Sequence, residues 1–411
     1  MNQDRKETTL IMFAALLLAF VRSPLLLIHG RVIAEEGTVY FQKAWDSSAL
    51  DALFAIHQGY YSLFTNGVAL LAEKLVPLEW AAFVFTFVSL LILMLTVYLA
   101  ITCEVFQDSR SRWMAAGIVM LTPSIEVWLT AEDVQFYLAV CTALICLSSE
   151  RRHRILRFAT LLLAGLSGVV SCALTPFFLL RAYRRRTLGA VLQAGVLAAC
   201  CSVQGVIILH TLHDGGRKLS SADKVRWFGP VMFLKIFAVT FFGRLGAFLS
   251  QHIVIRHTNT AVCLLFWLLA FLSLAFFWKV AKTGGEPAMV CFCMAIASLV
   301  FDYSAIGEPL QTIFIGAFRY VFTGFLLLWL IPVLAYAKAR SNGSSHDQKI
   351  ALYFALLILS WGAMDTVGYW TRFQCLTPEW SGQVAAWRKD PNTPIRVAPY
   401  DWPLQMHLRP H

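Results

Sequence analysis

The sequence predicts an all-α integral membrane protein with many membrane-spanning helices. Of its 411 residues, 58% are hydrophobic and 14% are charged, whereas soluble globular domains are usually nearer ~45–50% apolar. Apolar runs recur along the whole chain, and the basic residues fall in short clusters between them. Such clusters act as orientation signals in membrane proteins. The net charge of +10 therefore does not indicate a nucleic-acid partner.

The expected spans follow the apolar runs in chain order. The first run, 10–28, is close to the roughly 20 residues that cross a bilayer core, and it follows a polar segment. A cleaved signal peptide is the competing interpretation of this run, although no small-residue cleavage site follows it. Ten further runs bring the expected total to about eleven crossings. They are 80–102, 113–130, 134–149, 157–173, 175–183, 188–211, 259–280, 287–303, 318–337 and 350–368.

The positions of Lys and Arg predict how these spans are oriented. The basic clusters lie on one side if the runs flanking Pro176 form a broken hairpin of two short helices. The N-terminus is then cytoplasmic, and the loops 30–79 and 212–258 face away from the cytoplasm. Within the second loop, 227–251 is expected to lie in or dip into the outer leaflet, because a crossing there breaks the charge pattern.

The chain is accordingly expected to have two parts. Residues 1–368 form the transmembrane domain, and it contains both outer loops. Residues 369–411 form a short extracytoplasmic cap, because this tail is polar, rich in Pro and carries three Trp residues.

Carboxylates on the outer face are the first candidates for chemistry. Glu35 and Glu36 follow the first apolar run directly. A solvated pair at a helix start is the competing interpretation. The short outer segment 122–138 carries Glu132 and Asp133, and ionisable residues held against a membrane suggest function. Solvated loop carboxylates remain the alternative there, and that interpretation is favoured for Glu126.

Cations and aromatic residues on the same face are the second group of candidates. Arg319 and Tyr320 open a span from the outer side, where such residues are also ordinary interfacial anchors. Tyr60 either contacts a sugar ring or anchors the loop in the interface. Lys218 and Arg244, in the loop 212–258, add two further positive charges.

The order of these motifs along the chain resembles that of the GT-C superfamily of polyprenyl-phosphate-sugar glycosyltransferases, and specifically that of a bacterial branch. The likeness rests on the acidic pair AEEG after the first span, the acidic loop AED at 131–133, the short broken hairpin and the late outer Arg319-Tyr320 pair. The usual acidic pair of the superfamily begins with Asp. Here both positions are Glu, which keeps a carboxylate and lengthens its reach.

The resemblance implies an enzyme that moves a sugar from a polyprenyl-phosphate donor to an envelope glycan or lipid-linked acceptor. Glu35 matches the usual catalytic first acid and Glu36 its neighbour, and which of the two removes the acceptor proton stays open. Inversion in a single displacement is expected. The transfer takes place on the extracytoplasmic face of an integral membrane protein, in the bacterial inner membrane.

Further roles follow from the same resemblance. Glu132 and Asp133 match a loop that contacts the acceptor or a divalent cation, and no organic cofactor or resident metal is assigned. Membrane lipids are the remaining expected partner. Because the leaving lipid phosphate is an anion, nearby cations should stabilise it. The candidates are Arg319, Arg244 and Lys218.

Two other functions compete with the transferase. A transporter or flippase of lipid-linked sugars would be expected to have internal repeats and mid-span charges. No repeat is visible in the sequence, and Asp302 and Asp365 lie near span ends. A non-catalytic scaffold for envelope assembly would tolerate replacement of both Glu35 and Glu36.

Overall fold

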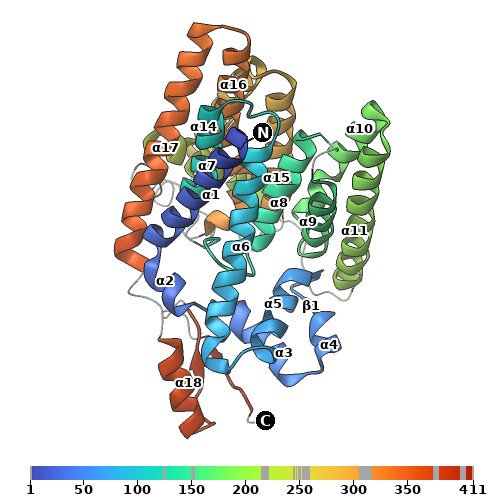
Figure 1. Cartoon of the computed structure of the whole chain (residues 1–411), viewed down its shortest axis with the longest axis vertical. Coiled ribbons are helices and arrows are strands. Elements are labelled where there is room, and N and C mark those ends of the chain that lie inside the picture. Colours follow the sequence, from blue (N-terminus) through green and yellow to red (C-terminus); the bar gives the residue numbers. More distant parts are fainter. Residues whose placement is uncertain are drawn as a thin grey trace.

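The computed structural model describes residues 2–123, 126–149, 153–213, 222–243, 246, 248, 251, 260–304, 317–373, 379–398 and 404–409. Within these residues the protein is a bundle of helices with two very short β-hairpins (Figure 1). The expected all-α class is therefore confirmed. In the first half of the chain the elements are α1 (Asn2–Arg22), α2 (Pro24–His29), η1 (Glu36–Phe41), α3 (Gln42–Asp46), α4 (Ala49–Leu53), β1 (Ile56–His57), β2 (Tyr60–Tyr61), α5 (Leu63–Lys74), η2 (Leu78–Trp80), α6 (Ala81–Thr102), α7 (Ser109–Leu121), α8 (Val134–Leu147), α9 (Arg154–Leu166), η3 (Ser171–Leu174), α10 (Thr175–Arg185) and α11 (Leu188–His213). The second half has α12 (Ala222–Met232), η4 (Phe233–Ala238), α14 (Thr260–Thr283), α15 (Gly285–Ser304), η6 (Ala317–Val321), α16 (Phe322–Ser341), α17 (Ser345–Phe373), α18 (Trp380–Lys389), β3 (Ile395–Arg396) and β4 (Gln405–Met406).

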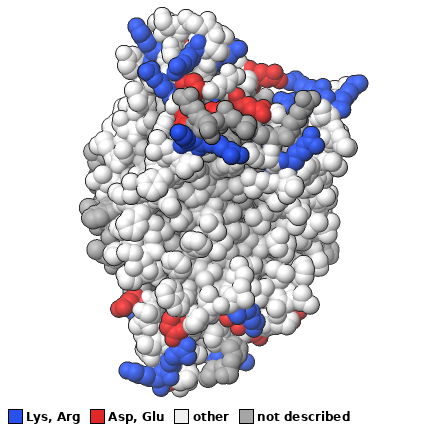
Figure 2. All heavy atoms as spheres, viewed as in Figure 1, with Lys and Arg blue, Asp and Glu red and all other residues white. Residues whose placement is uncertain are grey.

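Seven helical stretches among the described residues are long and apolar enough to cross a membrane, so the protein is an integral membrane protein. They are Leu78–Thr102, Leu188–Thr211, Val225–Gly243, Ala261–Thr283, Gly285–Ser304, Phe318–Ser341 and Ser345–Val367. Figure 2 shows charged residues at the two ends of the molecule and a broad uncharged band between them on this face. The total of about eleven crossings stays a prediction.

Two regions bear on the number of membrane crossings. The stretch Val225–Gly243, expected to lie in the outer leaflet, is one of the seven that could span the membrane by length and composition. In contrast, α7, α8, α9 and α10 have 13, 14, 13 and 11 residues, fewer than the roughly 20 of a full crossing. α9 and α10 are the two short helices expected on either side of a break, and η3 lies between them.

The helix α16 occupies the centre of the bundle. Every residue from Phe322 to Tyr336 is buried, as expected for a helix that is apolar on all sides. It packs against α7, α14, α15 and α17. The indole Nε1 of Trp329 donates to the Thr240 hydroxyl at 3.0 Å, so a buried polar group is satisfied between two helices. The rigid centre positions η6, which directly precedes α16 and carries Arg319.

The segment that follows α2 is held between α6 and the C-terminal tail. Gly30 has φ of +71°, and the Arg31 N–H donates to the Ala82 carbonyl and the Thr86 hydroxyl of α6. On the other side, Ala34 N–H donates to the Ala398 carbonyl at 2.7 Å. A β-bridge thereby joins residues more than 350 positions apart in the chain.

The described part of the tail packs on this same end of the molecule (Figure 1). The indole N–H of Trp380 donates to the Leu78 carbonyl at 2.7 Å, and that of Trp45 donates to the Arg409 carbonyl at 2.7 Å. The tail is therefore part of the structure that positions the segment after α2. Its expected extracytoplasmic location, and the division of the chain at residue 368, stay predictions.

Candidate active site

Glu36 joins two segments that are far apart in the chain. It begins the π-helix η1, and its side chain is 1% exposed. Oε2 accepts a hydrogen bond from Ile33 N–H at 2.9 Å, and Oε1 accepts from the N–H groups of Ala131 and Glu132. Burial raises the pKa of Glu36 to about 7, against the opposing effect of these three donors. Glu36 thereby fixes the loop 126–133 against η1, and it is not the solvated carboxylate of the competing interpretation.

Two buried arginines support the same loop. Arg31 donates from Nη2 to the Trp128 carbonyl and the Thr130 hydroxyl, both at 2.9 Å. The guanidinium carbon of Arg22 lies 3.9 Å from the centre of the Trp128 ring, and Nη1 donates to the Met120 carbonyl. A buried charge is costly unless it is hydrogen-bonded, so these arginines strongly favour one position of the loop.

Glu35 has a different environment from its neighbour. The residue is partly exposed, yet its Oε2 is buried and has no hydrogen-bond partner among the described residues. Burial raises the pKa values of Glu132 and Asp133, and the charge of Glu35 raises both further. The Glu35 carboxylate therefore lies close to the acidic loop and keeps an oxygen that can accept a proton.

A cavity of about 80 Å³ lies against the acidic loop. It is formed where β2, the start of α8, the end of α15 and η6 meet. Five of the residues selected from the sequence line it together: Tyr60, Glu132, Asp133, Arg319 and Tyr320. The other lining residues are Gln58, Gln135, Phe136, Val169, Val170, Phe301 and Asp302.

Two glutamines orient polar groups in this cavity. Gln58 has φ of +53° in the turn between β1 and β2, and its Nε2 donates to Glu132 Oε1 at 3.3 Å. Gln135 donates from Nε2 to the Tyr60 hydroxyl at 3.1 Å. Burial raises the pKa of Tyr60, so the phenol stays protonated and can itself donate a hydrogen bond.

Arg319 supplies the positive charge of the cavity lining. Its Nη2 donates to the Tyr320 hydroxyl at 3.3 Å, and its guanidinium carbon lies 5.1 Å from the Tyr320 ring centre. The backbone N–H of Arg319 donates to Glu126 Oε2 at 3.4 Å. Glu126 was expected to be a solvated carboxylate, but it is partly buried and burial raises its pKa. Burial also raises the pKa of Asp133, whereas Arg319 lowers it.

Two further residues of this region were not selected from the sequence. Lys235, on η4, is 3% exposed and its Nζ lies 5.6 Å from the Phe318 ring centre. Asp302 lines the cavity, is 2% exposed, and both carboxyl oxygens have no hydrogen-bond partner among the described residues. In each case the available signal was a single charge inside an apolar run, which does not by itself indicate where the side chain points.

Other expected contributors cannot be placed. Lys218 and Arg244 lie outside the described residues.

Within the described ranges, no group of three or more His, Cys, Asp or Glu side chains is arranged to hold a metal ion. The divalent cation that the resemblance allows stays a prediction.

Comparisons with known proteins give little support for any identity. No model of a protein family matches the chain, and no curated protein matches it. Among solved structures, the chain is similar to the crystal structure of ArnT from Cupriavidus metallidurans bound to undecaprenyl phosphate. The match has 16% sequence identity and a TM-score of 0.30, and covers 82% of this chain and 79% of that one. A likeness this low carries no argument about the present chain.

The environment of Glu36 leads to a prediction about stability. In Glu36→Gln, an amide NH₂ replaces one of two oxygens that both accept from backbone N–H groups. At least one buried donor then loses its acceptor, which costs about 1–3 kcal/mol. We expect a lower midpoint of thermal unfolding in detergent micelles. Glu35→Gln is the matched control and should keep the wild-type midpoint, and equal midpoints for both variants would contradict the assigned role of Glu36.

The buried carboxylates also predict how stability depends on pH. Glu36, Glu126, Glu132 and Asp133 all have raised pKa values because of burial. Between pH values of about 5 and 7 the folded protein therefore binds more protons than the unfolded chain, so stability falls as pH rises. Thermal unfolding followed across this range should show the midpoint falling with pH.

A pair of variants tests the source of this pH dependence. Glu132→Gln should make the fall with pH shallower. Glu79→Gln should leave it unchanged, because Glu79 lies apart from the acidic loop and is paired with the exposed side chain of Arg388. A midpoint that rises with pH in the wild type would refute the assignment.

Proposed function

We propose that the protein is a membrane glycosyltransferase that moves a sugar from a polyprenyl-phosphate donor to a glycan or lipid-linked acceptor on the extracytoplasmic face. The observation that carries this proposal is the unpartnered oxygen of Glu35 together with the cavity that its acidic neighbours line. The charge of Glu35 acts on Glu132 and Asp133, and these two residues line a small cavity with one guanidinium and several other polar groups. Proton removal and stabilisation of an anionic leaving group are the two requirements of this transfer.

Glu35 is the general base in this proposal. A base needs an oxygen that can reach the proton of an incoming hydroxyl. Glu35 Oε2 has no partner among the described residues, whereas both oxygens of Glu36 accept from backbone N–H groups. Glu36 is therefore a positioning residue that holds the loop on which Glu132 and Asp133 lie.

Arg319 and Lys235 are the cations that would stabilise the leaving lipid phosphate. Lys235 is buried and Arg319 is partly buried, and each lowers the pKa of the Glu126 carboxyl group against the larger, opposing effect of burial. A fixed positive charge in a site with little water is worth more than the same charge in solvent. Arginine also matches the geometry of a phosphate with parallel hydrogen bonds.

The remaining polar groups of the cavity suit a sugar or an acceptor hydroxyl. Tyr60 and Glu132 are held by Gln135 and Gln58, so their oxygens have fixed directions. A hydroxyl that attacks the anomeric carbon while Glu35 removes its proton displaces the lipid phosphate in one step. The anomeric configuration is then inverted.

One observation favours a transporter of lipid-linked sugars instead. Asp302 is a buried carboxylic acid in the candidate span Gly285–Ser304, and it lines the same cavity. Intramembrane carboxyl groups are typical of ion-coupled transport. A transporter would need Asp302 for movement of its substrate and would have no need for a base at Glu35.

The transferase is tested by comparing envelope glycans in cells that carry wild type, Glu35→Gln or Glu36→Gln at matched membrane levels. Removing a general base costs about 10²–10⁴-fold in rate, so Glu35→Gln should abolish one glycan while the protein stays folded. Glu36→Gln should lose glycan only in proportion to the folded protein that it loses. Glu79→Gln, a carboxylate paired with exposed Arg388, is the control.

Two outcomes would decide against this proposal. Unchanged glycans in Glu35→Gln would exclude the carboxylate base and favour the scaffold. If Asp302→Asn abolishes the glycan and Glu35→Gln does not, the transporter is favoured.

A further inference from the structure

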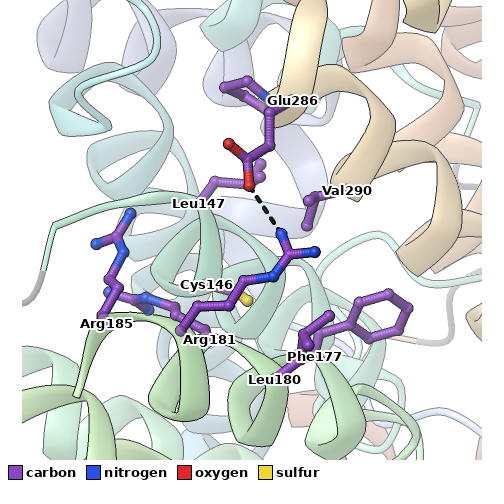
Figure 3. Close-up of a pocket in the computed structure, with 10 residues that line it drawn as sticks. Cys146, Leu147, Phe177, Leu180, Arg181, Arg185, Glu286 and Val290 are labelled. Carbon is purple, nitrogen blue, oxygen red and sulfur yellow. Dashed lines mark hydrogen bonds and ion pairs between the residues drawn. The ribbon is translucent and has the colours of Figure 1, made fainter.

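Figure 3 shows a second, larger pocket. The helix α10, which lines it, lies at the opposite end of the molecule from α18 and the C-terminus (Figure 1). The pocket has a volume of about 340 Å³, within the range of small-molecule pockets of roughly 300–1,000 Å³. Its walls are formed by α10 from Phe177 to Arg185, the end of α8 and the first two turns of α15. None of its residues takes part in the proposed transfer.

The pocket is positively charged. Three arginines line it, namely Arg181, Arg184 and Arg185, with Glu286 as the single carboxylate among its lining residues. Guanidinium groups are well suited to phosphate because their N–H groups match two phosphate oxygens at once. The excess of positive over negative charge indicates an anionic ligand.

Arg181 gives the pocket a fixed floor. Its side chain is 8% exposed, and it donates to the Ile145 carbonyl at 2.9 Å, the Ser148 carbonyl at 2.6 Å and Gln193 Oε1 at 3.2 Å. Two of these acceptors lie at the C-terminal end of α8, where the helix dipole also favours a cation. The guanidinium is thus held in one position at the base of the pocket.

Arg184 is available to a ligand at modest cost. Its Nη1 lies 3.1 Å from Glu286 Oε1, the dashed contact in Figure 3. The two side chains are 60% and 76% exposed. Exposed ion pairs of this kind contribute only about 0–1 kcal/mol. A phosphate diester, which also carries one negative charge and offers two oxygens to a guanidinium, can therefore replace the Glu286 carboxylate.

The surroundings of the pocket indicate that the ligand is a lipid. Leu147, Phe177, Leu180 and Val290 form apolar parts of its wall. On α10, at the edge of the bundle beside α11, Leu179 is 52% and Leu180 47% exposed (Figure 1). In a membrane protein such side chains face acyl chains, while the arginines lie at the level of the phosphates. Basic clusters that only set the orientation of a membrane protein would need neither a pocket nor a buried arginine.

We propose that this pocket binds the phosphate head group of an anionic phospholipid in the leaflet opposite the candidate active site. Arg184 and Arg185 contact the phosphate, and the acyl chains lie along Leu179 and Leu180. This assignment is independent of the proposed transferase.

Native mass spectrometry of the purified full-length protein in micelles tests the proposal. The probes are dioleoyl phosphatidylglycerol, dioleoyl phosphatidylcholine and sodium phosphate. Both lipids carry one phosphate anion, but the choline group adds a positive charge that the three arginines of the pocket repel, so phosphatidylglycerol should bind about tenfold more tightly than phosphatidylcholine. Arg184→Gln/Arg185→Gln removes charge-assisted hydrogen bonds and should bind phosphatidylglycerol about tenfold more weakly. Sodium phosphate should neither match nor displace the lipid.

The matched control is Arg110→Gln/Lys349→Gln, which removes two exposed charges outside the pocket. The affinity of this variant for phosphatidylglycerol should stay within about twofold of wild type, since additive effects are small for distant sites. In wild type and in this control, but not in Arg184→Gln/Arg185→Gln, phosphatidylglycerol should raise the midpoint of thermal unfolding more than phosphatidylcholine does.

Three results would overturn the proposal. One is equal affinity of wild type for the two lipids. Another is an unchanged affinity for phosphatidylglycerol in Arg184→Gln/Arg185→Gln. The third is binding of sodium phosphate as tightly as the lipid, which would indicate a free phosphate ligand.

Discussion

The buried carboxylate of Glu36 is the interaction on which the candidate active site depends. Removing a carboxylate from water is costly, and here three backbone N–H groups from two distant segments offset part of that cost. The same contact sets the distance between η1 and the loop 126–133. Arg31 reinforces it by holding the Trp128 carbonyl. Any change that leaves this carboxylate without its donors displaces the acidic loop.

The short segment 31–36 is held from several directions, which explains how a site can form on irregular backbone. Val32 and Ala34 pair with Ala398 of the tail, Arg31 N–H pairs with α6, and Glu36 pairs with the acidic loop. Glu35 lies within this segment without sharing its hydrogen bonds. A rigid support next to an unpartnered functional group is the arrangement expected of a preorganised site.

The sequence was sufficient to select five of the twelve residues that line the cavity but not to assign roles within it. Composition and apolar runs predicted the helical membrane protein, and the search for charged and aromatic residues on the outer face selected Tyr60, Glu132, Asp133, Arg319 and Tyr320. Glu36 differs from Glu35 because it accepts hydrogen bonds from the backbone N–H groups of residues 131 and 132. The local sequence around residues 35 and 36 does not show these contacts with a distant loop. Lys235 and Asp302 were missed because each is a single charge inside an apolar run, and the sequence does not show where such a side chain points. The number of crossings was hard to predict because α7 to α10 are shorter than a regular span.

Binding of a polyprenyl phosphate to the purified protein tests the central claim most directly. The proposed transfer releases this lipid from the donor whichever sugar the donor carries. The affinity of the lipid can be measured for wild type, Arg319→Gln and Arg184→Gln by native mass spectrometry. The proposed site predicts that Arg319→Gln binds the lipid about tenfold more weakly, because one charge-assisted contact is lost. It predicts that Arg184→Gln binds the lipid as tightly as wild type. Equal binding by wild type and a folded Arg319→Gln variant would contradict the claim that this cavity takes the lipid phosphate.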